Sequence, residues 1–323
     1  MIEISARLRL FAGAAMVALS GAALGQTFPA KPIKLIVGFA PGGGGDTGAR
    51  VIAQGMTSSQ PIVIENRPGA AGTIAAAAVA RSAADGYTLL VDDHAATVYA
   101  SALFKGLTYD PGKDLAVVSP IFQSPFLVLA GPALKASNLK ELLEQARANP
   151  GRISYGHPGV GTGHHIGIEL FKQRAGVDLA SVAYKGGALA VQDTVGGQIQ
   201  LVITSALPAT AELIRAGRLR AIAVTAKTRL PNYPDAPALA EVVPGYEAAT
   251  WVGIWAPAGT PRDVMQVLNG EFSKSLRRPD ITKRFEEMGL EAIPRTLDET
   301  TQIWRNDLAV WPPAIKKMNI TIE

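Results

Sequence analysis

The sequence predicts an α/β fold, and two observations support this. Short apolar runs rich in β-branched residues alternate with helical segments, once over the first hundred residues and again over residues 126–225. This alternation is typical of a mainly parallel sheet covered by helices. In both blocks, glycine-rich loops join a strand end to a helix start. Ligands bind at the carboxyl ends of strands in such sheets, so we expect a binding site on these loops.

The N-terminus has the features of an export signal. Arg7 and Arg9 supply positive charge, residues 10–19 form a short apolar core, and residues 23–25 offer the small side chains that a signal peptidase reads. We therefore expect residues 1–25 to be removed near Gly25, Gln26 to begin the mature chain, and the protein to be periplasmic. The apolar core is too short for a stable membrane span.

Composition excludes several classes of protein. The chain has no cysteine, which excludes disulfides, thiol catalysis and cysteine metal sites. Its 31 basic and 27 acidic residues give a net charge of +4 without a basic run, so we expect no nucleic-acid partner. The sequence lacks the G-x-S-x-G and H-E-x-x-H motifs. We expect a protein that is not an enzyme and that needs no cofactor and no metal.

Residues 33–50, IKLIVGFAPGGGGDTGAR, carry the strongest signal. An apolar strand over residues 33–39 leads into a glycine turn, with Asp46 predicted as the helix N-cap. The free N–H groups and the dipole of a helix N-terminus bind anions. We predict ligand contacts in this stretch from Phe39, Pro41, Gly42, Gly43, Asp46 and Thr47.

The same glycines allow an alternative, a dinucleotide-binding enzyme. Gly43, Gly45 and Gly48 satisfy G-x-G-x-x-G after a strand, and Glu65 ends the next apolar run, where an acidic ribose partner is expected. Against this, four consecutive glycines match the pattern easily, and Asp46 would bring negative charge to the pyrophosphate. A Walker A loop is excluded because no Gly-Lys-Ser/Thr follows.

Polar residues follow the third predicted strand, over residues 87–91. Asp92 and His94 either contact a ligand there or belong to a solvated loop in which Asp93 caps a helix over residues 94–104. Residues 109–125 are predicted to form a connecting segment.

The second block repeats the arrangement. A strand over residues 126–130 precedes a helix that Asn138 caps, and residues 153–162 form a strand and a Gly/Pro loop before another helix. Thr162 is predicted as an N-cap whose hydroxyl could instead serve a ligand, and His157 could donate to an anion. Further predicted contacts follow later strands, at Gly186, Thr204 and Ser205. The last helix is predicted to follow Thr296 and to end at residues 311–313.

Eight stretches, in order, resemble the extracytoplasmic solute-binding receptors of the tripartite tricarboxylate transporter family, also called the Bug or TctC family. They are KPIKLIVGFAPGGGGDTGAR (31–50), IENRPGAAGTIAA (64–76), DGYTLL (85–90), YDPGKDL (109–115), YGHPGVGTGHHIGIELF (155–171), YKGGALAVQDTVGGQ (184–198), AGRLRAIAVT (216–225) and WVGIWAPAGTP (251–261).

The resemblance implies a two-lobed periplasmic-binding-protein-like fold of type II, a Venus flytrap with two hinge crossovers. Lobe 1 would take residues 26–124 and, by a C-terminal return, residues 250–323, and lobe 2 residues 125–249. The receptor would act as a monomer that delivers a small organic acid to membrane permease subunits. A sensor partner that presents the ligand to a signalling protein is the alternative.

The chain departs from the family's pattern at four places, all at the expected mouth of the cleft. Gly45 stands where Thr is common, His157 where a small hydroxyl residue is usual, and Thr204 where many members carry an acid. Residues 92–94 replace a weakly polar loop. Our hypothesis is a carboxylate-bearing ligand with a hydrogen-bond donor at its far end, and Asp92 would accept from that donor.

Overall fold

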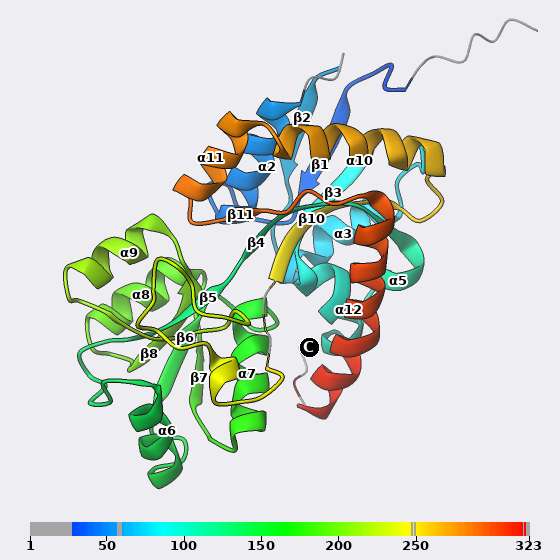
Figure 1. Cartoon of the computed structure of the whole chain (residues 1–323). Helices are drawn as coiled ribbons and strands as arrows, with labels where there is room; N and C mark the ends of the chain where they lie inside the picture. Colours follow the sequence, from blue (N-terminus) through cyan, green and yellow to red (C-terminus); the bar gives the residue numbers. More distant parts are fainter. Residues whose placement is uncertain (1–27, 57–59, 247, 249, 319, 321–323) are drawn as a thin grey trace, which may run out of the picture.

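Two α/β lobes make up the chain, and two crossovers join them (Figure 1). The structure is a computed structural model that describes residues 28–56, 60–246, 248, 250–318 and 320. The chain leaves lobe 1 after β4 (Leu115–Ser124) and returns to it with β10 (Thr250–Pro257). Within the described ranges, no helix is long and apolar enough to cross a bilayer.

Lobe 1 contains a six-stranded sheet of order β11-β4-β10-β3-β1-β2. Its strands besides β4 and β10 are β1 (Ile33–Val37), β2 (Ile62–Asn66), β3 (Thr88–Asp92) and β11 (Glu291–Ala292). The predicted parallel pairing of the first hundred residues is confirmed, because β1 pairs in parallel with both β2 and β3. Strand β10 then runs antiparallel to β3 and β4.

Helices cover both faces of this sheet (Figure 1). Because side chains alternate along a strand, Leu35 and Val37 enter one apolar cluster with α2, α10 and α11, whereas Ile36 enters the other with α3 and α12. The helical elements are α2 (Gly44–Gly55), η2 (Ala70–Gly72), α3 (Thr73–Ala80), η3 (Ala95–Tyr99), α4 (Ala100–Leu103), α5 (Pro111–Asp114), α10 (Arg262–Leu276), α11 (Pro279–Glu287) and α12 (Leu297–Lys317).

Lobe 2 contains a five-stranded sheet of order β7-β6-β8-β5-β9. Its strands are β5 (Phe126–Ala130), β6 (Ser154–His157), β7 (Ala180–Ala183), β8 (Leu201–Ser205) and β9 (Arg220–Val224). Its helices are α6 (Leu139–Ala148), α7 (Gly163–Ala175), α8 (Gly187–Val195), α9 (Pro208–Arg215) and η4 (Leu239–Glu241). Strand β6 pairs in parallel with β7 and β8, and β5 runs antiparallel to β8.

The predicted connecting segment over residues 109–125 is wrong for most of its length, since it contains α5 and the long strand β4. Pro120 interrupts the apolar run and argues against a central strand, because proline lacks the N–H that a ladder needs. The structure accommodates Pro120 with an irregularity in the pairing with β10, where Gly253 faces Pro120 and Val252 faces Phe122. The residue between them, Ile121, is left over as in a β-bulge.

Helix α12 was predicted to end at residues 311–313, and this is wrong. The helix contains Pro312 and Pro313 and continues to Lys317. Ile315, beyond the prolines, is fully buried in the core that α12 shares with β10 and η3. Tertiary packing therefore overrides the local tendency of proline to end a helix.

Side-chain caps confirm two predicted helix starts. The Asn138 amide oxygen accepts from Glu141 N at 3.0 Å, and Thr296 with Glu299 forms a capping box at α12.

Replacing Asn138 by alanine leaves the N–H of Glu141 without its partner and should destabilise the protein by about 1 kcal/mol. We expect a melting temperature lower by roughly 2–4 °C. Lys140→Ala, in the same first turn, is the control and should leave it unchanged.

Candidate functional site

The carboxyl ends of the parallel strands lie at the crossovers in both lobes. Asp92 at the end of β3 pairs with Gly253, shortly after the chain has returned to lobe 1 at Thr250. In lobe 2, Ser205 at the end of β8 pairs with Phe126, which directly follows the first crossover. The loops after these strands therefore lie at the junction of the two lobes, where a ligand can touch both.

Asp46 organises the first glycine loop. Its buried carboxylate accepts from Gly42 N at 2.9 Å, from Arg50 Nε at 3.0 Å and from Asn66 Nδ2 at 2.8 Å. Asn66 Nδ2 also donates to Phe39 O at 3.0 Å. Although burial alone would raise it, the pKa of Asp46 is lowered by hydrogen bonds from Arg50, Asn66 and Gly42. The carboxylate is thus charged and neutralised within the protein.

Asp46 is not the N-cap that the sequence suggested. Helix α2 begins at Gly44 with Gly43 as its N-cap, and Asp46 lies in the first turn and bonds back to the loop. Pro41, Gly42 and Gly43 are exposed, and Thr47 N donates to Gly43 O at 2.9 Å. The N–H groups of residues 44–46 precede that first helical bond, so they have no partner within the helix.

A second loop in lobe 1 was read from the sequence only as a turn. Residues 69–72 all have positive φ, at 127°, 46°, 51° and 84°. For Ala70 and Ala71 this conformation is strained, and such strain concentrates at functional sites. The loop leads into α3, whose N-cap is Gly72. Two glycines and a proline marked a turn in the sequence, but nothing marked the alanines.

Asp92 lies behind both glycine loops. Its side chain is 1% exposed, Oδ1 accepts from Asp93 N at 2.9 Å, and Oδ2 has no partner among the described residues. A Cβ on Gly38 or Gly72 would lie only 1.9 or 2.2 Å from Oδ2. Burial raises the pKa of Asp92 well above its usual range, as does the neighbouring Asp93. Burial therefore favours the neutral form of Asp92. Asp93 accepts from Ala95 N at 2.8 Å in the capping role proposed for it.

His94 is part of the packing between β3, β10 and α12. Its Nε2 lies 2.9 Å from Asp307 Oδ2, and its Nδ1 accepts from Trp251 N at 3.4 Å. The ring stacks on Tyr99 and is 2% exposed. Both ring nitrogens have protein partners, so a ligand contact from His94 would require one of these bonds to break.

In lobe 2, the predicted N-cap at Thr162 is confirmed. Its Oγ1 accepts from His165 N and donates to Gly159 O at 2.8 Å. His157 is fully buried, with Nδ1 2.9 Å from Gly159 O and Nε2 2.9 Å from Ser181 Oγ. Its ring stacks on His165 at 4.4 Å. His157 thus supports the loop from behind, and its ring nitrogens have partners already.

The remaining predicted residues of lobe 2 lie at the ends of β7 and β8. Gly186, at φ 122°, is the N-cap of α8. Thr204 lies beside it, since a Cβ on Gly187 would be 3.5 Å from Thr204 Oγ1. Ser205 Oγ is 3.3 Å from Nε2 of His164. His164, not included in the predicted site, stacks on Phe126 at 3.9 Å.

Two features of the described residues bear on the alternatives. Glu65, the proposed ribose partner of a dinucleotide, is ion-paired with Lys34 Nζ at 3.1 Å and Arg67 Nε at 2.6 Å. Among the residues that the structure describes, no group of three His, Asp or Glu side chains is arranged to hold a metal ion.

Comparison with known proteins identifies the family. The sequence profile described as "Tripartite tricarboxylate transporter family receptor" matches residues 48–320. Protein BugT of Bordetella pertussis is 34% identical over 296 residues, which cover 90% of each chain. The chain belongs to this receptor family.

Solved structures of similar proteins share the fold. An adipate-bound protein from R. palustris is 32% identical with a TM-score of 0.80, and the match covers 91% of this chain and 100% of that one. MatC from Rhodopseudomonas palustris, solved with bound malate, is 31% identical with a TM-score of 0.78 over 89% of this chain and 100% of its own. The predicted two-lobed fold is confirmed.

Membership of this receptor family also decides between a binding protein and an enzyme. The protein is a solute-binding receptor rather than an enzyme, and receptors of this family are periplasmic and work with tripartite transporter permeases. The predicted signal peptide, residues 1–25, lies outside the described residues.

Asp92 makes stability depend on pH in a direction that can be tested. A carboxyl whose pKa is raised by folding loses stability as the pH rises above its unfolded value of about 4. Asp92→Asn keeps the shape and cannot ionise. We expect it to melt higher than the parent protein at pH 7–8, with the difference shrinking towards pH 4. A pH-independent difference would show that Asp92 is not a buried neutral acid.

The buried histidines of lobe 2 make the folded protein less stable as the pH falls, the opposite of the effect of Asp92. Burial lowers the pKa of His165 to about 3, with smaller effects from His157 and Lys172, and burial also lowers that of His157. The unfolded chain binds protons near pH 6.5, so stability falls as the pH drops below that value. His165→Asn keeps an acceptor for Gly161 N. Its melting temperature should fall less than that of the parent protein between pH 7 and pH 5, and an identical slope would contradict this.

Proposed function

We propose that this receptor captures a small carboxylate-bearing solute between its two lobes and delivers it to the permease subunits of a tripartite transporter. The mature protein would begin near Gln26, after removal of residues 1–25, and would act as a monomer. The solute would lie on the loops after β1, β2 and β3 in lobe 1 and after β6, β7 and β8 in lobe 2.

One observation carries this proposal. Three helices at the junction, α2, α3 and α8, each have a glycine as N-cap: Gly43, Gly72 and Gly186. A glycine N-cap offers no side chain to the first-turn N–H groups and lets a ligand approach the backbone, although in α3 the N–H of Thr73 already donates to Ala70 O. With the partial positive charge of the helix N-termini, these groups suit an anion held from both lobes.

The charges behind the loops support an anionic solute. Asp46 is neutralised by Arg50, and Asp92 is driven towards its neutral form, so neither acid opposes a carboxylate strongly. Adipate and malate, bound to the related proteins from Rhodopseudomonas palustris, are both dicarboxylates. We propose the same chemistry here.

The far end of the solute would meet the hydroxyls of Thr204 and Ser205 and the imidazole of His164. Ser205 Oγ and His164 Nε2 lie 3.3 Å apart at the end of β8 and the start of α7, whereas Thr204, the preceding residue of the strand, faces α8. The hypothesis that Asp92 recognises a hydrogen-bond donor on the solute needs a path past Gly38 and Gly72, which cover its Oδ2. Loss of affinity in Asp92→Ala, with His157→Ala measured beside it, would support that finer hypothesis.

A thermal-shift screen of the mature protein tests the solute class. Adipate, malate, citrate, aromatic acids, amino acids and NAD would be compared. A solute at a hundred times its dissociation constant adds about 2.7 kcal/mol, which at roughly 2–4 °C per kcal/mol is a clear shift. We expect the shift from small carboxylates. A shift with NAD alone would support the dinucleotide alternative.

A single substitution tests the helix N-termini. Gly44 is exposed, and a Cβ there meets no atom within 4 Å. Gly44→Asp places a carboxylate in the first turn of α2, which favours the helix but repels an anionic solute. We expect an unchanged or higher melting temperature and an affinity for the carboxylate at least tenfold lower by calorimetry. Gly44→Asn, similar in shape but neutral, is the matched control, and equal affinity of the two variants would contradict the proposal.

A further inference from the structure

The inference rests on the proposed function and concerns how the receptor meets its permease. A permease must distinguish a loaded receptor from an empty one, and the two differ by rotation of the lobes. A surface within one lobe does not change in such a rotation. Only a surface to which both lobes contribute differs between the loaded and the empty receptor.

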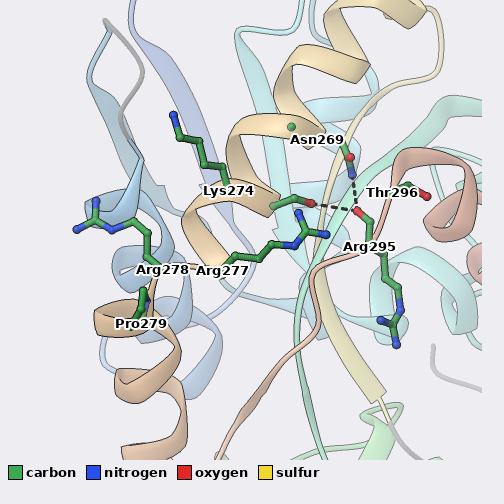
Figure 2. Close-up of a pocket in the computed structure, with 9 residues that line it drawn as sticks. Asn269, Lys274, Arg277, Arg278, Pro279, Arg295 and Thr296 are labelled. Atoms are coloured by element: carbon green, nitrogen blue, oxygen red, sulfur yellow. Dashed lines mark hydrogen bonds between the residues drawn. The ribbon is translucent and has the colours of Figure 1, made fainter.

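A basic groove lies entirely within lobe 1, so its shape does not change when the lobes rotate. It is lined by Lys274, Arg277 and Arg295 from α10 and the segment before α12, and Figure 2 shows Arg277 extending towards the backbone of Arg295. Its floor is fixed, because Asn269 Nδ2 and Ser273 Oγ donate to Arg295 O at 3.1 and 3.0 Å. This groove can attract an anionic partner, but it cannot report closure.

A second groove, which we call the interlobe groove, lies between α11 of lobe 1 and α9 of lobe 2. Its volume is about 700 Å³. Lobe 1 contributes Glu286, Glu287 and residues 289–291, and lobe 2 contributes part of α9 and residues 230–233. Both helices are seen on the same side of the molecule in Figure 1. The width of this groove therefore depends on the angle between the lobes.

The lobes touch directly at the base of the interlobe groove. Gly289 has φ 70°, and a Cβ on it would lie 2.1 Å from the carbonyl oxygen of Ala206. Ala206 directly follows Ser205, at the end of β8 in the proposed solute site. The proposed solute site and the interlobe groove are therefore adjacent in the chain.

The two walls of the interlobe groove differ in chemistry. On the lobe 1 wall, Glu287 is 3.9 Å from Lys283 Nζ, and the Glu286 side chain has no partner among the described residues. The lobe 2 wall offers partly buried apolar surface from Ile214, Leu230 and Tyr233. Its cation, Arg215, is already paired with Glu212. The complementary partner is a peptide with a basic side chain beside apolar ones.

We propose that the interlobe groove is the surface on which a basic, apolar-flanked periplasmic segment of the permease recognises the solute-loaded receptor. The glutamates of the wall repel anionic lipid headgroups and a carboxylate solute alike, which makes a basic peptide the fitting occupant. Because binding and closure are linked, a segment that fits one angle between the lobes binds the loaded form more tightly.

The experiment measures solute binding and uptake separately. Proteoliposomes would hold the permease subunits of the same organism, with adipate or malate as the labelled solute and receptor added outside. Glu286→Lys and Tyr233→Ala should leave the dissociation constant of the solute within twofold. Both should raise the receptor concentration for half-maximal uptake at least tenfold. Lys274→Glu, an equal but opposite charge reversal in the basic groove of the same lobe, is the matched control and should stay within twofold.

Several outcomes would overturn the proposal. Unchanged uptake with both groove variants would exclude the groove as the docking surface, and an equal loss with Lys274→Glu would indicate general electrostatics at the membrane. A dimer in sedimentation that Tyr233→Ala dissociates would assign the groove to a second copy of the chain. If the parent protein binds no carboxylate, the proposed function itself fails, and calorimetry shows this independently of uptake.

Discussion

The hydrogen bonds of one buried carboxylate, that of Asp46, hold the first binding loop of lobe 1 in place. Asp46 joins the loop at Gly42, the side chain of Arg50 in α2 and the end of β2 at Asn66. Asn66 then binds the carbonyl of Phe39, at the other end of the same loop. A glycine loop has high conformational entropy, and these bonds select one conformation before any solute arrives. Preorganisation of this kind lowers the cost of binding.

Much of the fold follows from local sequence signals, and the exceptions have physical reasons. The alternation of strands and helices, the cap at Asn138 and the capping box at Thr296 depend on neighbouring residues and were predicted correctly. Strand β4 and the end of α12 were missed because both contain proline, and in both the long-range packing decides the conformation. A bulge opposite Gly253 and the burial of Ile315 cannot be read from adjacent residues.

The candidate site shows the same division. Sequence patterns located the strand ends and the glycine loops, because turns and helix starts have local signatures. They did not reveal where the side chains point. His94 and His157 lie behind the loops with both ring nitrogens engaged, whereas His164 lies beside Ser205. The left-handed alanines at residues 70 and 71 had no signal at all, since alanine does not favour positive φ.

Helix α12 gives the two lobes a shared core. Ile166 of α7 in lobe 2 is buried in the same cluster as Tyr99 and Trp304 of lobe 1, and Trp311 packs against both this cluster and the main apolar cluster of lobe 2. A side chain that packs in two cores cannot lose one of them without exposing apolar surface in the other. This shared packing favours cooperative melting of the two lobes, although each has its own sheet. Any rotation between them must also keep Ile166 of α7 within this cluster or expose it.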